Sequence, residues 1–195
     1  MKTTLRLLGA LLGVALLLGA GFALYVQARG VPRYPVPVAT VAVPAGTPAQ
    51  LALGERLVQA SCAECHLNKL TNRLSGHQLR DTPPEFGTVY AANITQDPAR
   101  GIGAWTNQEI GALVRTGIGR DGRYRLIMPH YAHLSDDDLG AVLAFLRSSH
   151  PWVQADPTPT PAQAPSLLLK ALANTVMKPT PLVPGPRLAP PLPTP

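Results

Sequence analysis

The placement of the prolines constrains the fold of this chain more than any other feature. Of its 22 prolines, five lie within residues 32–48, four within 83–129, and thirteen from 151 onward. Proline has no amide hydrogen and clashes with the preceding helical turn, so it interrupts helices and central strands. The two proline-dense flanks are therefore not expected to form the helices or central strands of a core. The foldable body is predicted to be one small domain at residues 47–152.

The net charge of +6 does not indicate a nucleic-acid-binding protein. Between Gln50 and His150 there are ten Lys and Arg residues and ten Asp and Glu residues, so the body is neutral. The excess positive charge lies in the flanks, without the basic face that nucleic-acid binding requires. We expect no nucleic-acid partner.

The N-terminal segment has the composition of a membrane-spanning helix. After Lys2 and Arg6, residues 7–26 contain no charge and no proline, and twenty such residues can cross a bilayer. We expect residues 1–28 to be a membrane anchor or uncleaved signal, crossing the cytoplasmic membrane once. Residues 26–28 can also be read as a small-residue cleavage site, so the alternative that this segment is a cleaved signal peptide stays open. Residues 29–46 are predicted to be a stiff proline-rich spacer that carries the body on the periplasmic side.

Three helix starts in the body follow from side-chain chemistry. Thr47 to Gln50 and Thr106 to Glu109 are capping boxes, and Ser135 precedes three aspartates that suit the positive end of a helix dipole. Gly54 lies near the apolar face of the first helix, where it would let another helix approach closely. Gly117 is placed to end the second helix and Pro151 to stop the third. Since the body has no alternating strand pattern, the predicted class is mainly α.

The segments outside these helices are long for so small a domain. Residues 67–103 are irregular and rich in Gly, Asn, Asp and Pro. A loop of this length argues against a plain helical bundle and is expected to wrap a group that supplies the missing apolar core. The tail, residues 153–195, is predicted to be proline-rich and irregular, with a short apolar helix near residues 166–177.

Both cysteines of the chain fall in one motif, Cys62-Ala63-Glu64-Cys65-His66. C-x-x-C-H is the attachment signal for c-type haem. Two thiols one helical turn apart reach the two vinyl groups on one porphyrin edge, and the following histidine meets the iron. A structural zinc site would need four protein ligands, and a redox dithiol would be expected near a βαβ pattern. The sequence favours one covalent haem c, with His66 as an iron ligand.

The second axial ligand is predicted to be Met128, in Ile127-Met128-Pro129 ahead of the third helix. The proline stiffens the loop, and a methionine opposite histidine gives a high-potential haem with no free coordination site. His130 is the leading competitor. The other candidates are His77, His133, His150 and Met177.

These blocks together resemble the single-haem, class I-type bacterial cytochromes c. The matching segments are the glycine-containing helix ahead of the motif, Asn93-Ile94-Thr95, the Gly-Ile-Gly-x-Trp-Thr-x-x-Glu block at residues 101–109, Arg115-Thr116-Gly117, Asp121-Gly122-Arg123, Met128-Pro129, and residues 134–148. Ala92 stands where relatives often have proline. Similar modules occur in the cytochrome subunits of periplasmic alcohol and sugar dehydrogenases.

The resemblance implies a cytochrome c fold, in which three or more helices and long loops wrap one haem after a transmembrane helix. It implies thioether bonds at Cys62 and Cys65, His66 and Met128 on the iron, and Trp105 near the haem edge. The implied function is electron transfer between a dehydrogenase and a terminal oxidase or other acceptor outside the cytoplasm. The resemblance thus implies an electron carrier and not an enzyme. The alternative is a haem enzyme or a gas or redox sensor with an open sixth coordination site.

Overall fold

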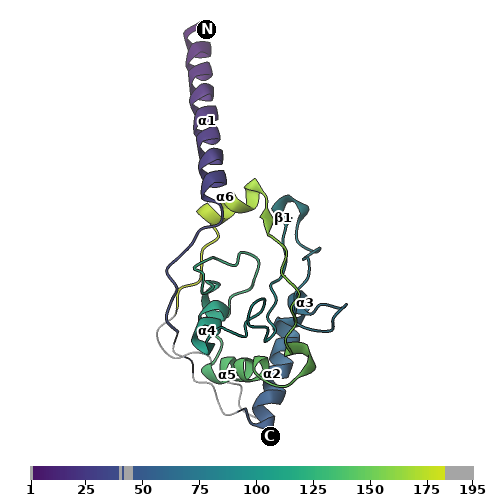
Figure 1. The fold of residues 1–195 in the computed structure, drawn as a ribbon. Helices are drawn as coiled ribbons and strands as arrows, with labels where there is room; N and C mark the ends of the chain where they lie inside the picture. Colours follow the sequence, from purple (N-terminus) through teal and green to yellow (C-terminus); the bar gives the residue numbers. More distant parts are fainter. Residues whose placement is uncertain (1, 40, 42–45, 183–195) are drawn as a thin grey trace.

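The computed structural model describes residues 2–39, 41 and 46–182 (Figure 1). Within these residues it contains six α-helices: α1 (Lys2–Arg29), α2 (Pro48–Ser61), α3 (Ala63–His66), α4 (Asn107–Thr116), α5 (Asp136–Leu146) and α6 (Leu167–Thr175). Two short 3-10 helices, η1 (Pro84–Phe86) and η2 (Pro151–Val153), lie in the connections. The strands β1 (Gly87–Thr88) and β2 (Ala164–Pro165) form one short antiparallel pair. The prediction of a mainly α protein is confirmed.

The side-chain caps predicted for the body helices are present. Thr47 and Gln50 make both bonds of a capping box at the start of α2, with Pro48 in the first turn. Thr106 and Glu109 do the same for α4. The Ser135 hydroxyl accepts a hydrogen bond from the Asp138 amide at the start of α5. These bonds satisfy amide groups that have no partner within their own helix, and this fixes where each helix begins.

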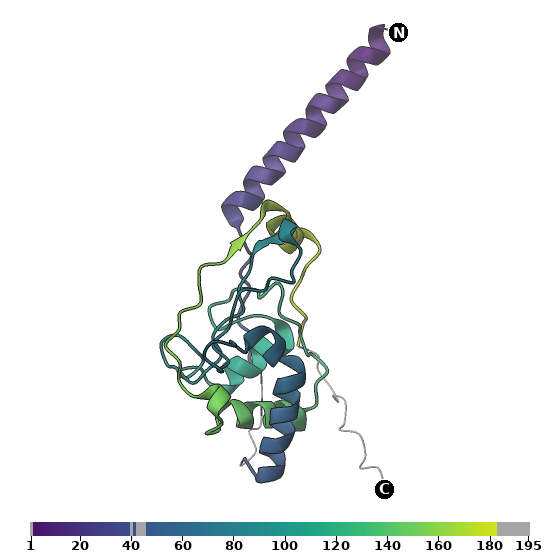
Figure 2. The same ribbon diagram turned by 90° about the vertical axis from the view of Figure 1, so that its right-hand side faces the viewer.

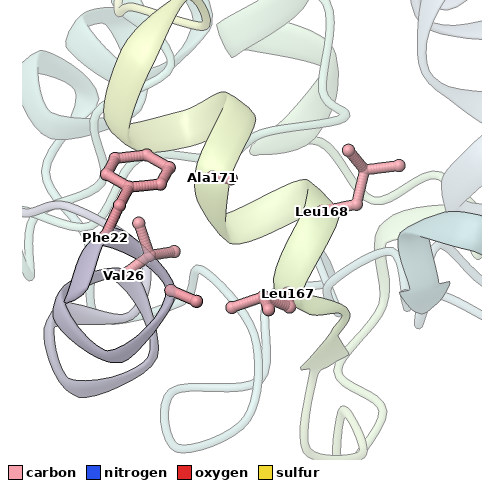
Figure 3. A pocket seen from close by; sticks show the side chains of 6 residues that line it. Phe22, Val26, Leu167, Leu168 and Ala171 are labelled. Atoms are coloured by element: carbon pink, nitrogen blue, oxygen red, sulfur yellow. The ribbon is translucent and has the colours of Figure 1, made fainter. Parts of the chain in front are cut away.

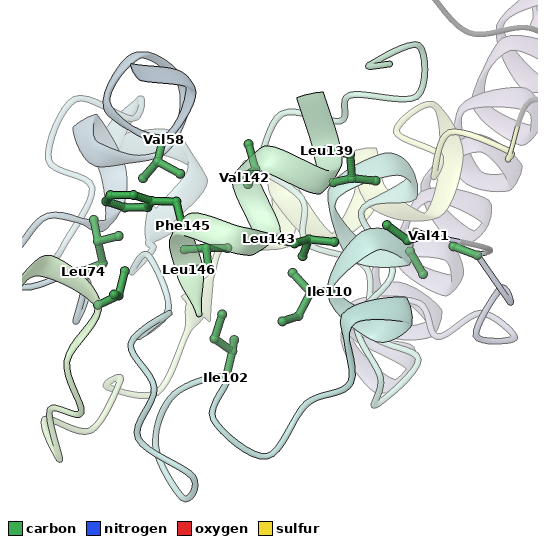
Figure 4. Close-up of a cluster of buried hydrophobic side chains, with 13 residues drawn as sticks. Val41, Val58, Leu74, Ile102, Ile110, Leu139, Val142, Leu143, Phe145 and Leu146 are labelled. Atoms are coloured by element: carbon green, nitrogen blue, oxygen red, sulfur yellow. The ribbon is translucent and has the colours of Figure 1, made fainter. Parts of the chain in front are cut away.

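The core forms where α2 and α5 cross (Figures 1 and 4). Gly54 is the point of closest approach, because a β-carbon there would lie 2.1 Å from the carbonyl oxygen of Ala141 in α5. Val58, Leu143 and Phe145 are at most 2% exposed and fill the space beside this crossing. The expectation that Gly54 admits another helix is confirmed.

Two helix ends show how backbone conformation shapes the body. Gly117 ends α4 in the left-handed conformation (φ 76°), as predicted. Helix α5 ends at Leu146, so the prediction that Pro151 stops it is wrong. The backbone tightens at this point: the Arg147 amide donates to the carbonyls of Leu143 at 3.1 Å and Ala144 at 3.2 Å, and the Ser148 amide donates to the Phe145 carbonyl at 2.9 Å. The Arg147 guanidinium donates to the Ile102 carbonyl at 3.1 Å and to the Asn107 side chain at 3.1 Å.

The stretch after α1 lies along the body instead of standing clear of it as a spacer. The Tyr34 amide donates to the Gly122 carbonyl at 2.8 Å. Ala39 and Val41 are 2% and 7% exposed and belong to the hydrophobic core. The Val41 side chain reaches the position that a β-carbon on Gly111 of α4 would occupy. The absence of a side chain at Gly111 is what leaves room for Val41. Residue 40 and residues 42–45 of the predicted spacer lie outside the described residues.

The described part of the tail wraps the body. Asn93 donates to the carbonyls of Asp156 at 2.8 Å and Thr158 at 3.0 Å, and the tail then pairs as β2 with β1. After α6 the tail returns to the body, where the Tyr124 hydroxyl donates to the Lys178 carbonyl at 2.9 Å. Residues 183–195 of the predicted tail lie outside the described residues.

Helix α1 projects from the body as a single rod (Figure 2). It is long and apolar enough to cross a membrane. Within α1 only Val26, near its C-terminal end, is buried in the rest of the protein. An apolar surface of this size is expected to lie in lipid.

Candidate haem site

The C-x-x-C-H motif lies at the junction of two helices. Cys62 ends α2 and begins α3, and its carbonyl accepts hydrogen bonds from the amides of Cys65 at 3.2 Å and His66 at 2.9 Å. The motif is thus one tight helical turn, which brings the two thiols and the imidazole together. Both thiols are free and half-buried. This is the arrangement that two thioether bonds to one porphyrin edge require.

The environment of the thiols does not favour thiolate chemistry. Burial, with a smaller effect of Cys65, raises the pKa of Cys62 to about 11. Burial and the neighbouring charge of Glu64 also raise the pKa of Cys65. Reactive dithiols have lowered thiol pKa values. Nor do the described residues contain a group of three or more His, Cys, Asp and Glu side chains that could hold a metal ion, which is what a zinc site would require.

The His66 ring is held in one orientation and one tautomer. Its Nδ1 lies 2.7 Å from the carbonyl oxygen of Ala92. A carbonyl can only accept, so Nδ1 carries the proton and Nε2 keeps the lone pair that an iron ligand needs. Burial lowers the pKa of His66, the hydrogen bond to Ala92 opposes this, and His77 lowers it slightly further. A neutral imidazole of fixed orientation fits an axial ligand of haem.

Sequence reasoning singled out His66 but missed the role of the Ala92 carbonyl. The only signal was its position just before Asn93-Ile94-Thr95, where relatives often have proline. The neighbouring Ala91 amide donates to the His77 carbonyl at 2.9 Å, and the Ile94 amide donates to the Leu74 carbonyl at 2.8 Å. These bonds hold the segment in place beside the histidine.

Met128 is half-buried in the loop between α4 and α5. The loop is fastened to α4 on both sides of the methionine: the Arg125 amide donates to the Gly117 carbonyl at 2.8 Å, and the Tyr131 amide donates to the Val114 carbonyl at 2.9 Å. The Tyr131 hydroxyl also lies 3.3 Å from the Ser61 carbonyl. Since Ser61 precedes Cys62, this contact brings the loop to the C-x-x-C-H turn.

The competitor His130 packs against the tail. Its Nδ1 lies 3.2 Å from the Thr180 hydroxyl, and its ring centre is 5.3 Å from that of Tyr124. Burial lowers the pKa of His130, and a hydrogen bond to the Arg125 backbone raises it by a smaller amount. One ring nitrogen of His130 is therefore engaged by the C-terminal segment.

The remaining candidates lie in different parts of the structure, and of them His77 is beside the C-x-x-C-H motif. The His77 ring is within 3.2 Å of the Glu64 carbonyl, and the His150 ring accepts a hydrogen bond from the Trp152 amide at 3.2 Å. His133 is exposed. Met177 follows α6, where its amide donates to the Leu172 carbonyl at 2.8 Å.

Trp105 is half-buried against the hydrophobic core, directly before the cap of α4. The guanidinium of Arg120 lies 5.0 Å from the centre of its ring, a cation–π contact. Its carbonyl accepts a hydrogen bond from Arg147. Nothing in the sequence pattern indicated the pairing with Arg120, because the two residues are not neighbours on one helix.

Several known proteins are similar to part of this chain. A subunit of the nicotinate dehydrogenase of Pseudomonas putida is 36% identical over 125 residues, which are 62% of this chain and 10% of that protein. The cytochrome c subunit of the quinone-dependent alcohol dehydrogenase of Gluconobacter oxydans is 36% identical over 96 residues, 47% of this chain and 20% of that protein. The gluconate 2-dehydrogenase cytochrome c subunit of Pantoea cypripedii is 34% identical over 108 residues, 53% of this chain and 24% of that protein.

The chain thus spans a quarter or less of the length of these relatives. Residues 49–146 match the family described as cytochrome c oxidase, cbb3-type, subunit III, whose cytochrome c domain implies covalent haem c. The match begins one residue after the start of α2 and ends with the last residue of α5. With half of its length matched, the chain belongs to this family of cytochrome c domains.

Proposed function

We propose that this chain is a membrane-tethered carrier of single electrons with one haem c, in a domain at residues 47–152. Cys62 and Cys65 form the thioether bonds, and His66 and Met128 are the axial ligands. One observation carries the proposal. His66 lies on the same helical turn as both thiols, and the Ala92 carbonyl holds its ring in one orientation. Helix α1 crosses the cytoplasmic membrane and the domain lies on the periplasmic side.

The bound haem would supply an iron that alternates between the ferric and ferrous states. The protein's part is to hold the two axial side chains still, which lowers the structural change that accompanies each electron. His66 is restrained through Nδ1, and the Met128 loop is restrained at Gly117, Val114 and Ser61. With both axial positions filled, no site remains for substrate, which supports a carrier rather than an enzyme.

The electron donor is proposed to be a dehydrogenase and the acceptor a terminal oxidase or another protein outside the cytoplasm. The names of two relatives support the donor, because each is the cytochrome c subunit of a dehydrogenase. A neutral body with a net excess of charge only in its flanks gives no sign of a nucleic-acid partner.

Replacing Met128 with alanine tests the ligand assignment. We expect the reduction potential to fall by on the order of 100 mV, because axial ligands tune haem potentials over ~0.8 V. The ferrous variant should also bind carbon monoxide, whereas the parent protein should not. Redox titration and visible spectra of the haem-loaded protein measure both effects.

The matched control is His130→Ala, two residues away in the same loop. Its potential and its carbon monoxide response should stay those of the parent. If Met128→Ala leaves the potential unchanged, Met128 is not the ligand. Ready carbon monoxide binding by the unmodified protein would instead indicate a haem enzyme or sensor with an open coordination site.

A further inference from the structure

Helix α6 lies across the C-terminal end of α1, far from it in sequence (Figures 1 and 2). Two polar contacts join α6 to the end of α1 and the residue after it: the Lys170 ammonium donates to the Gln27 side chain at 2.9 Å, and the Asn174 side-chain amide donates to the Gly30 carbonyl at 2.9 Å. The chain therefore returns to the point where its N-terminal helix enters the body.

A wholly apolar groove opens between the two helices (Figure 3). Its walls are Phe22, Ala23 and Val26 of α1 and Leu167, Leu168 and Ala171 of α6. The other side of α6 is already used, because Leu169 and Ala173 are 1% and 0% exposed against the protein. Leu167 and Leu168 remain 46% and 48% exposed. Helix α6 is thus apolar on both sides. On the groove side α1 covers it only in part: Val26 is fully buried, but Leu167 and Leu168 stay exposed.

The groove continues the apolar surface of α1. The leucines of that helix are exposed, as for Leu17 at 76%, and Phe22 is 43% exposed at the edge of the groove. A helix rises 1.5 Å per residue, so Phe22 and Val26 occupy about the last 6 Å of the apolar stretch that ends at Val26. When that stretch fills the hydrocarbon layer of a bilayer, the groove faces the boundary between acyl chains and headgroups.

Two residues in the last turns of α1 have the chemistry typical of that boundary. Tyr25 is 49% exposed, and the guanidinium of Arg29 lies 5.7 Å from the centre of its ring. Arg29 also donates a hydrogen bond to the Tyr25 hydroxyl. Amphipathic aromatic rings and snorkelling basic side chains concentrate at membrane surfaces.

We propose that α6 is an interfacial membrane helix, whose Leu167 and Leu168 enter the outer boundary of the bilayer beside α1 and whose groove takes lipid acyl chains. Lys170 and Arg29 then lie at the level of the lipid phosphates. The inference rests on the proposed insertion of α1 in the membrane. It adds a second point of attachment, which fixes the tilt of the haem domain relative to the bilayer.

Spin labels on the full-length haem-loaded protein in phosphatidylcholine–phosphatidylglycerol nanodiscs test this inference. Single variants Leu168→Cys and Leu167→Cys place the label on α6. Leu17→Cys is the reference within the membrane, and Leu70→Cys, at a site 96% exposed on the body, is the reference in water. In the haem-loaded protein Cys62 and Cys65 are taken up by the proposed thioether bonds, so parent protein treated in parallel should take up no label. The measured quantity is the ratio of oxygen to nickel-chelate accessibility in power-saturation spectra.

The labels at positions 167 and 168 should both be several-fold more accessible to oxygen than to the nickel chelate, between the values at positions 17 and 70. Water-like values at both α6 positions, with a bilayer value at position 17, would overturn the interfacial role of α6 while α1 still spans the membrane. A water-like value at position 17 would overturn the membrane span and this inference together.

Discussion

Replacing Gly54 with alanine tests the crossing of α2 and α5, on which the position of the haem motif depends. The new β-carbon would lie 2.1 Å from the Ala141 carbonyl oxygen and 2.8 Å from both the Ala141 carbonyl carbon and the Phe145 β-carbon. The shortest of these distances falls below ordinary van der Waals contact by roughly 1.3 Å. Backbone atoms cannot rotate away, so one helix must move.

The size of the effect follows from two opposing contributions. Overpacking a core costs about 1–3 kcal/mol, and the upper end applies because the clash is with backbone. Alanine in place of glycine inside a helix returns about 1 kcal/mol. The free energy of unfolding should therefore fall by about 2 kcal/mol. For a domain of this size that lowers Tm by roughly 8–16 °C.

The assay is thermal unfolding of the full-length haem-loaded chain in detergent, followed by the haem absorbance and by circular dichroism. Arg56→Ala, on the exposed side of α2, is the control and should change the unfolding free energy by less than ~0.5 kcal/mol. Adding Ala141→Gly to Gly54→Ala should bring no rescue, because the clashing atoms of Ala141 are backbone atoms. A Gly54→Ala protein as stable as the parent would refute the close crossing.

Three further predictions concern other parts of the body. Arg115→Ala removes hydrogen bonds from a fully buried guanidinium to the Ala132 and Leu134 carbonyls and its ion pair with Asp136 at the start of α5. It should lower the unfolding free energy by about 3 kcal/mol in chemical denaturation. Burial alone would raise the pKa of Asp156, but hydrogen bonds from nearby hydroxyls outweigh it and lower the pKa. Asp156 therefore stabilises the fold above the unfolded-state pKa of ~4, and this contribution is lost as the pH falls through the lowered folded-state value. Asp156→Asn should flatten the acid limb of the stability profile; an unchanged limb would contradict the assignment. Gly117→Ala strains a left-handed residue and drives its β-carbon to within 2.0 Å of the His130 ring, so Tm should fall by several degrees, and by less when His130→Ala is added.

The parts of the fold that the sequence predicted are those encoded by neighbouring residues. A capping box such as Thr106 to Glu109 is complete within four residues, so its pattern is visible without any tertiary contact. Gly54 was recognisable because a glycine on an apolar helix face has few other uses. The C-x-x-C-H turn is local in the same way, which is why the thiols and His66 were found together.

The parts that the sequence did not predict depend on contacts between distant residues. Part of what holds the tail on the body is isolated hydrogen bonds, such as that from Asn93 to the Asp156 carbonyl at 2.8 Å, and isolated polar pairs leave no periodic pattern. The burial of Val41 depends on a gap beside Gly111 that exists only once α4 has packed. The hydrogen bond between His66 and the Ala92 carbonyl likewise forms only once the loop has folded, so the sequence alone does not reveal it.

The stretch that follows α1 has a consequence for how the protein can meet its partners. Because the Tyr34 amide is hydrogen-bonded to the Gly122 carbonyl and Ala39 is packed in the core, the connection between α1 and the domain is short and held against the body. With α1 inserted in the membrane as proposed, the height of the domain above the lipid would be nearly constant. Encounters would then be a two-dimensional search, restricted to partners whose own redox centre lies at the same height.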